Sequence, residues 1–213
     1  MFSFSKTFIT KLNFGFMLCV KRGLSHEMQD FVNFFLISAP YFPKVFGEEI
    51  VDVLKKSLQD PGNLFSYEHT YFAEVSSVIA GMLLGCDWRV KSKENLKTGF
   101  LFLKLSGSKR FLMLDTYLKF NNTVGRLDKF EYYISNIAAY EKFRGKGVGK
   151  AVMSIAEKKA KRSGCMRVVF NVEKKNAKSI AFYKSLGFEE KVRFDISINK
   201  GGVLSFTRMV KLL

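Results

Sequence analysis

The chain has 213 residues, of which 47% are hydrophobic and 25% are charged, a composition that suits one folded domain with an ample core. No apolar run approaches the roughly 20 residues needed to cross a bilayer, and no signal peptide is visible, so we expect a cytoplasmic protein that does not bind membranes. The formal net charge is +16, but the lysines are scattered, without a basic helix or an RNA-binding signature, which disfavours a nucleic-acid partner.

The cysteines indicate a reducing compartment. Cys19, Cys86 and Cys165 are odd in number, widely separated and set among apolar residues, which argues against a disulfide framework. Because only His26 and His69 could join them, we expect no metal site and buried, inert thiols.

Residues 1–16 are assigned to no element. We interpret them as an N-terminal extension of uncertain role: a flexible tail, a strand-extending tail, or the product of a start codon placed too early. The remainder, 17–213, is predicted to form a single domain.

The domain is expected to begin with a strand at Met17–Val20 and a helix that ends at Ser38. Ser25 is the expected N-cap of this helix, and Pro40 and Pro43 are the residues expected to end it. A second helix should follow and stop at Asp60-Pro61-Gly62, because apolar residues recur at helical spacing: Phe46, Ile50, Val53, Leu54 and Leu58.

A β-hairpin is predicted next. Tyr71–Val75 and Val78–Gly85 are rich in β-branched and aromatic residues, and only Ser76 and Ser77 separate them. His69 directly precedes the hairpin and is interpreted as a surface histidine with its hydrogen bonds satisfied, with a role in a binding site as the alternative.

The segment that follows the hairpin is long. The chain runs for 46 residues between Gly85 and Tyr132, where a simple hairpin connection needs about 2 to 5. We interpret about 88–130 as an insertion with one or two helices that covers a binding site or makes a dimer contact. Lys91–Lys97 is helix-compatible, and an apolar stripe is expected at Phe111, Leu114, Tyr117 and Leu118.

The most informative stretch begins at Tyr132. Tyr132–Ala139 predicts a buried strand, and after a glycine-rich turn the apolar period becomes helical up to Gly164. Met166–Val172 predicts a second buried strand, parallel to the first because a helix connects them. A short helix over Asn176–Leu186, capped by Gly187, then precedes two strands around Lys191–Ile198 and Leu204–Lys211, joined at 199–202.

The turn before the long helix has the features of an anion site. The first amides of a helix lack intrahelical partners and lie at the positive end of its dipole. Glycines let the backbone approach a ligand closely, and cationic side chains add charge. Both kinds of residue alternate here, in the order Arg144, Gly145, Lys146, Gly147, Val148, Gly149 and Lys150. We therefore expect a phosphate or pyrophosphate ligand.

Spacing narrows the choice of ligand. The P-loop pattern fails because Ala151 follows Gly149-Lys150, and the dinucleotide pattern G-x-G-x-x-G fails because the glycines fall at 145, 147 and 149. The turn instead fits R-x-x-G-x-G, directly after a strand. A second pattern follows: Asn176 near a helix start, Tyr183 in its third turn and Gly-Phe at its exit.

Together and in this order, the two patterns resemble the GNAT family of acetyl-CoA-dependent N-acetyltransferases. The resemblance runs from about Tyr132 to Glu190, and Ser179, where the family more often has Ala, is a small departure. It implies an α/β (α+β) GNAT-type fold, with a mixed, mostly antiparallel central sheet, a splayed parallel strand pair and helices on both faces.

The resemblance also implies how acetyl-CoA, the acyl donor, would be held. The turn would bind the pyrophosphate, the end of the preceding strand would pair its backbone with the pantetheine arm and stabilise the oxyanion, and Asn176 would either contact the coenzyme or cap its helix. The expected coenzyme-binding residues are Ile137, Ala138, Ala139, Arg144, Gly145, Lys146, Gly147, Val148, Gly149, Lys150 and Asn176. A basic surface suits this polyanion.

The expected catalytic acid is Tyr183, with a role as a core aromatic as its alternative. A phenol with a pKa of about 10 is protonated at neutral pH and can protonate a departing thiolate whose conjugate acid has a pKa near 8.5. The base is left open among Glu173, Glu131, Tyr133 and Ser135, acting directly or through water.

These inferences predict an N-acetyltransferase that transfers an acetyl group to a primary amine of a small molecule or a protein. The alternatives are an acyltransferase with a longer acyl group, a non-catalytic CoA-binding regulator, and a basic nucleic-acid-binding protein on the same fold. In the family the first two helices line the acceptor site, which would place Tyr41 and Phe42 there or leave them in the core. The identity of the acceptor amine and the question of whether the protein forms a homodimer are left open.

Overall fold

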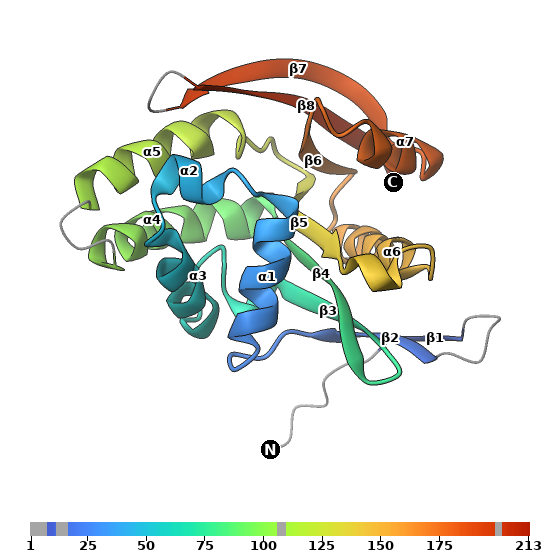
Figure 1. Ribbon diagram of the computed structural model, residues 1–213. Helices are drawn as coiled ribbons and strands as arrows, with labels where there is room; N and C mark the ends of the chain where they lie inside the picture. The colour runs from blue at the N-terminus through green and yellow to red at the C-terminus, as the bar shows by residue number, and fades with distance from the viewer. Residues whose placement is uncertain (1–7, 12–16, 106–109, 199–201) are drawn as a thin grey trace.

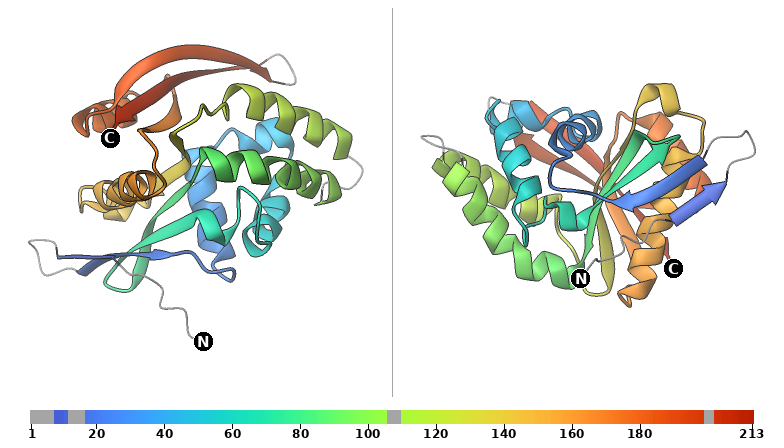
Figure 2. Two further views of the ribbon diagram at one scale, coloured as in Figure 1. Left: turned by 180° about the vertical axis from the view of Figure 1, so that it is seen from behind. Right: turned by 90° about the horizontal axis from the view of Figure 1, so that it is seen from below.

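The computed structural model describes residues 8–11, 17–105, 110–198 and 202–213. They form an eight-stranded sheet in the order β1-β2-β3-β4-β5-β6-β8-β7, with helices on both faces (Figures 1 and 2). Neighbouring strands are antiparallel except for β5 and β6, which are parallel. The predicted fold class is therefore confirmed. The strands are β1 (Phe8–Lys11), β2 (Met17–Arg22), β3 (Thr70–Val75), β4 (Val78–Asp87), β5 (Glu131–Ala139), β6 (Arg167–Glu173), β7 (Glu189–Ile198) and β8 (Gly202–Leu212).

The helices divide between the two faces of the sheet. Helix α6 (Val148–Arg162) and helix α7 (Ala177–Ser185) lie on one face. The other face carries α1 (Met28–Ser38), α2 (Phe42–Phe46), α3 (Ile50–Gln59), α4 (Trp88–Leu105) and α5 (Arg110–Thr123). Short 3₁₀ turns, η1 (Tyr67–His69) and η3 (Glu141–Phe143), precede β3 and α6. Among the described residues, no helix combines the length and the hydropathy that a membrane span requires.

Successive side chains of a strand point to opposite faces of the sheet, and this alternation produces two hydrophobic cores, one on each face. In β3, Tyr71 and Ala73 pack on the α6 side, whereas Phe72 packs on the side of α1, as the two-residue period of a strand requires. The α1 side is dominated by phenylalanine, and Phe31, Phe34 and Phe72 are fully buried there. This aromatic core fixes the elements that surround the inner end of the site described below.

The first helix begins later than predicted. Its N-cap is Glu27, with no side-chain cap, and the prediction of Ser25 as N-cap is wrong. The reason is a turn in which the Glu27 carboxylate accepts the Leu24 N–H at 2.7 Å and pairs with Lys21 at 2.7 Å. The helix does end at Ser38, as expected.

The predicted second helix is two helices. Pro43 lies in the first turn of α2, where a missing N–H costs nothing, so this proline helps to start a helix. Gly47, at φ +88°, then separates α2 from α3. The hairpin is confirmed: Ser76 and Ser77 both have positive φ, as a two-residue β-turn between paired strands requires.

Residues Phe8–Lys11 of the N-terminal extension pair antiparallel with β2. The remainder of that extension, 1–7 and 12–16, and the predicted turn residues 199–201 lie outside the described residues. Cys19, Cys86 and Cys165 are buried free thiols, as predicted.

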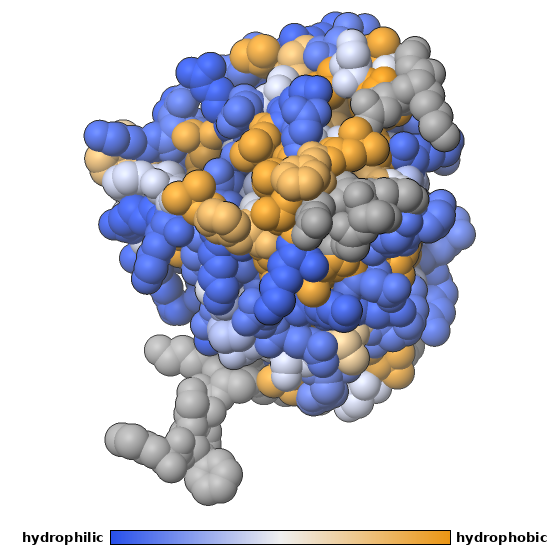
Figure 3. Space-filling model, turned by 90° about the vertical axis from the view of Figure 1, so that its left-hand side faces the viewer, coloured by the Kyte–Doolittle hydropathy of each residue, from blue (hydrophilic) through white to orange (hydrophobic). Residues whose placement is uncertain are grey.

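The segment from 88 to 130 contains α4 and α5, in agreement with the expected helices. The predicted stripe on α5 is partly wrong, because Phe111 and Leu118 are 72% and 44% exposed. The buried face is instead Met113, Tyr117 and Phe120, which recur at helical spacing toward α2 and α4. Figure 3 shows apolar side chains gathered on the side of the molecule where α4 and α5 meet. That this segment is an insertion in a single domain over 17–213 stays a prediction.

Candidate active site

The site begins where β5 and β6 separate. The two strands pair only at Glu131–Tyr133 with Arg167–Val169. Immediately afterwards β5 contains a bulge: Ile134 pairs with Gly85 and Asn136 with Leu84, so Ser135 has no partner on β4. A bulge bends its strand and increases the twist, which explains why β5 turns away from β6 at this point. The predicted splayed parallel pair is therefore present.

A groove of about 610 Å³ occupies the splay. Its walls are β5 from Ile134 to Ala139, β6 from Phe170 to Glu173, the turn before α6, and α7. The groove brings together nearly all of the predicted site residues: Ile137, Ala138, Ala139, Arg144, Gly145, Gly147, Val148, Gly149, Lys150, Asn176 and Tyr183. Lys146 does not line it, and its ammonium lies 5.3 Å from the centre of the Phe143 ring.

The start of α6 offers unpaired amides to the groove. Gly147 is the N-cap, in the left-handed conformation at φ +78°, and no described side chain caps the helix. The first intrahelical bond runs from the Ala151 N–H to the Gly147 carbonyl, 2.9 Å, so the N–H groups of the three residues between them have no intrahelical acceptor. A Cβ on Gly149 would lie 3.0 Å from the Phe182 ring, so the close packing of this helix turn against α7 favours glycine. These amides and the helix dipole favour an anion here.

The β5 wall offers a second row of backbone groups. The Tyr140 N–H donates to the Ala80 carbonyl of β4 at 3.0 Å. Because hydrogen-bonding sides alternate along a strand, the backbone groups of Ala139 and Ile137 face away from β4 and toward the splay. An extended ligand in the groove therefore meets a free strand edge.

Tyr183 reaches the groove from α7. Its ring is 8% exposed and packs edge-on against Phe170, with 4.4 Å between ring centres. Its hydroxyl makes no hydrogen bond to the residues that the structure describes. Burial raises the pKa of Tyr183 above its usual value, so the phenol is protonated at neutral pH. Tyr183 is thus both a core aromatic and a groove residue.

Asn176 performs the helix-capping role. Its side-chain oxygen accepts the Ser179 N–H at 3.2 Å. The residue also lines the groove, and the cap leaves its side-chain N–H groups available as donors.

The four residues considered as a base lie in different surroundings. Glu131 is at the start of β5, 3% exposed, and pairs with Arg208 at 2.9 Å, so it is a buried structural ion pair outside the groove. Burial raises the pKa of Tyr133 to about 12. The Ser135 hydroxyl donates to the Asn136 side chain at 2.8 Å. Only Glu173, at the end of β6, places a carboxylate in the groove wall, where Lys175 pairs with it at 2.8 Å.

The sequence matches the family model described as "Acetyltransferase (GNAT) family" over residues 31–188. The chain belongs to the GNAT family. Similar solved structures include an acetyltransferase (TM-score 0.62, 20% identity, covering 91% of this chain and 98% of that one) and an N-acetyltransferase from Staphylococcus aureus Mu50 (0.59, 19%, 90% and 99%). A third is yncA from Salmonella typhimurium, solved with its cofactor acetyl-CoA (0.54, 15%, 92% and 94%). No curated protein sequence gives a significant match. GNAT membership supports acetyltransferase activity.

Several residues that line the groove of this GNAT protein were not predicted from the sequence. Lys178, in the first turn of α7, adds a cation beside Asn176, and its position next to the second motif could have revealed it. Phe206 and Asn171 had no local signal. Asn171 lies on β6 itself, whereas Phe206 reaches the groove because β8 pairs with β6, a long-range pairing that spacing along the chain does not reveal.

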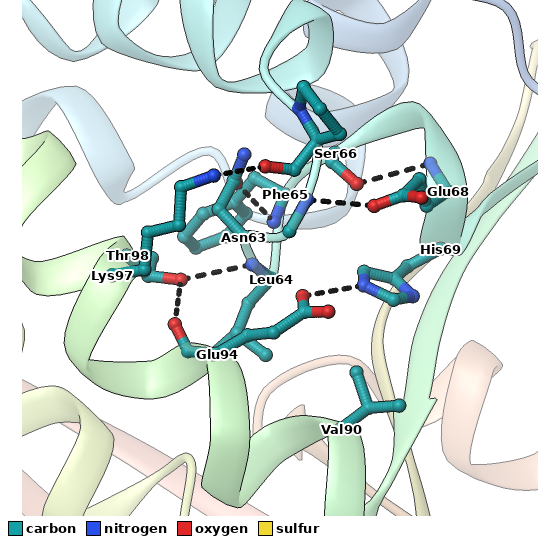
Figure 4. Close-up of polar contacts among 12 residues, drawn as sticks. Asn63, Leu64, Phe65, Ser66, Glu68, His69, Val90, Glu94, Lys97 and Thr98 are labelled. Carbon is teal, nitrogen blue, oxygen red and sulfur yellow. Dashed lines mark hydrogen bonds and ion pairs between the residues drawn. The ribbon is translucent and has the colours of Figure 1, made fainter.

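His69 lies outside the groove and has a hydrogen-bonding partner, as expected, but its side chain is only 12% exposed and is therefore less of a surface residue than predicted. Its ring lies 2.7 Å from the Glu94 carboxylate of α4 (Figure 4). Close by, the Leu64 N–H donates to the Thr98 hydroxyl of α4 at 3.0 Å. Glu68 is within 4.8 Å of this pair but already accepts the Gly62 N–H. The network anchors α4 to the segment before β3.

Proposed function

We propose that this GNAT protein is an N-acetyltransferase that transfers an acetyl group from acetyl-CoA to a primary amine of a small molecule or a protein. The proposal depends on one observation, which is that unpaired backbone N–H groups border the groove in two places. One is the start of α6, and the other is the free edge of β5. Buried free thiols support a cytoplasmic location.

The groove suits a long, polyanionic thioester. The pyrophosphate would lie on the amides of Val148, Gly149 and Lys150, with the side chains of Arg144 and Lys178 adding positive charge. The pantetheine arm would run along the edge of β5 and accept and donate backbone hydrogen bonds as a strand does. This orientation brings the thioester toward the inner end of the splay, near the bulge at Ser135.

The chemistry then follows from the groups around that inner end. The amine nitrogen attacks the thioester carbon, and a free backbone N–H of β5 stabilises the oxyanion that forms. The Glu173 carboxylate, directly or through a water, takes the proton that the amine loses. Collapse breaks the carbon–sulfur bond, and the Tyr183 hydroxyl protonates the thiolate.

Thiol release tests the proposal. The whole chain, acetyl-CoA and a panel of amines and N-terminal peptides would be monitored for free CoA with a thiol reagent, and the acetylated product confirmed by mass spectrometry. We expect amine-dependent release. Binding of acetyl-CoA without release for every amine class would favour a CoA-binding regulator, and salt-sensitive retention of DNA with no CoA binding would favour the nucleic-acid alternative.

A further inference from the structure

A second cavity adjoins the inner end of the groove. It has a volume of about 90 Å³ and lies on the side of α4 and α5. Its walls are mainly aromatic and include Phe42, Phe46, Phe102, Tyr117, Phe120 and Tyr133. We call it the aromatic chamber.

The chamber and the groove share a wall. Both are lined by Tyr41, Ser135 and Asn171. The Tyr41 ring stacks on Phe120 of the chamber with 6.2 Å between ring centres, and meets Phe206 of the groove edge-on at 5.6 Å. Because Ser135 is the bulge residue at the apex of the splay, the chamber begins where the groove ends. A group carried by a ligand at the inner end of the groove therefore faces the chamber across Tyr41.

One cation lies in the wall of this apolar chamber. The Lys91 ammonium, from the first turn of α4, donates to the Asn121 side-chain oxygen and lies 5.8 Å from the centre of the Tyr133 ring. Among the described residues, no carboxylate is within ion-pairing distance of it. The two nearest acidic residues in sequence are engaged elsewhere: Asp87 with Arg89 and Glu94 with His69.

The surroundings of Lys91 disfavour its charge. Partial burial lowers its pKa, and withdrawing a charge from water without a counter-ion is costly. A second polar group is also unsatisfied, because the side-chain oxygen of Asn171 is buried in the shared wall and has no donor. The chamber thus lacks an anion at one side and an N–H or O–H donor at the other.

We propose that the aromatic chamber binds a short apolar chain that ends in a carboxylate, with the carboxylate on Lys91 and the chain among the aromatic rings. The volume limits the chain, since a cavity of roughly 150 Å³ takes a benzene ring, so about 90 Å³ admits a few carbon atoms. The inference rests on the proposed function, because it names the substrate class of that same site. The carboxylate belongs either to the acceptor, as in an ω-amino acid whose amine donates to Asn171, or to a dicarboxylic acyl group.

Two arms of one experiment distinguish these sources. Using the whole chain saturated with CoA, calorimetry would compare 4-aminobutyrate with butylamine, which has the same length and no carboxylate. The second arm, on the chain without added CoA, would compare succinyl-CoA with butyryl-CoA. We expect the carboxylate compound to bind at least about tenfold more tightly in one arm, which identifies the source. Equal affinities in both arms would overturn the proposal.

A matched pair of variants assigns the effect to Lys91. Lys91→Met keeps the apolar stem and removes the charge, and it should abolish the preference for the carboxylate. Lys93→Met, on the exposed side of the same helix, should retain it. A preference that survives in Lys91→Met would contradict the proposal.

A measurement on the wild-type protein covers the case in which Lys91→Met does not fold. The methyl ester of 4-aminobutyrate, or butyryl-CoA in the acyl arm, should bind at least about tenfold more weakly than the free carboxylate; equal binding refutes the proposal. These binding results need no turnover. A chain that binds the carboxylate but releases no CoA with any amine would refute the proposed function and leave this inference standing.

Discussion

Gly147 provides a stringent test of the anion site, because the same substitution can be made at the other end of the same helix. Gly147 has φ +78° at the start of α6 and lines the groove. Gly164 has φ +66° just beyond the end of α6, with nothing within 4 Å of an added Cβ. Alanine at either position meets a left-handed backbone that costs about 1–2 kcal/mol, partly offset by about 0.4–1 kcal/mol from the stiffer unfolded chain.

Both variants should therefore lose roughly 1 kcal/mol of unfolding free energy, a fall in Tm of about 2–4 °C for a domain of this size. They should differ in coenzyme binding. Alanine at 147 relieves its strain by moving the amides that follow it, and each charge-assisted hydrogen bond lost is worth about 1.5–3 kcal/mol. The Kd for CoA should rise about 10- to 100-fold in Gly147→Ala and stay unchanged in Gly164→Ala.

Thermal unfolding and titration calorimetry with CoA measure the two quantities separately. If Gly147→Ala lost stability as Gly164→Ala does, yet bound CoA with the wild-type Kd, the amides at the start of α6 would not be the phosphate ligands. A stability loss confined to Gly147→Ala would show that the two positions are not equivalent and would refute the strain calculation.

The remaining predictions concern the reaction and the pH dependence of stability. Tyr183→Phe should lower kcat about 10²-fold or more with an unchanged Kd for CoA, and unchanged kcat would exclude the acid role. Glu173→Gln should lower kcat/KM by a similar factor, with recovery at a pH where the free amine deprotonates unaided; a deficit independent of pH would argue against a base. Burial raises the pKa of Cys86 and of Tyr133 to about 12 each, above their unfolded values of about 8.5 and 10. The folded state holds these protons more tightly, so their stabilisation is present below the unfolded values and is lost as the pH rises toward 12. Urea titrations should show a falling unfolding free energy from about pH 9 to 12, and a flat profile would contradict the burial of these groups.

Local chemistry explains which parts of the fold were predictable. Gly147 and Gly187 both adopt positive φ at the helix ends where the sequence placed them, because few other residues tolerate that conformation. The serine pair at 76 and 77 likewise specifies a turn between two strands. The prediction of Ser25 as an N-cap failed because the carboxylate of Glu27, two residues later, accepts a backbone N–H and forms a different turn.

The features that could not be predicted from the sequence depend on contacts between elements distant in the chain. The bulge at Ser135 depends on the register between β4 and β5, and Phe206 enters the groove because β8 lies between β6 and β7. The sequence does not distinguish Lys91 from the other scattered lysines. The packing of α4 against α5 is what places it in an aromatic wall. Each of these features depends on residues distant in sequence. Hydrophobic periodicity predicts the helix or strand to which a residue belongs, but it does not predict which distant elements that helix or strand contacts.

A crystal structure of this protein with bound CoA tests the central claim most directly. We expect the pyrophosphate oxygens within about 2.7–3.1 Å of the N–H groups at the start of α6, and the pantetheine arm along the edge of β5 at Ile137 and Ala139. Coenzyme bound elsewhere, with the start of α6 facing only solvent, would contradict it.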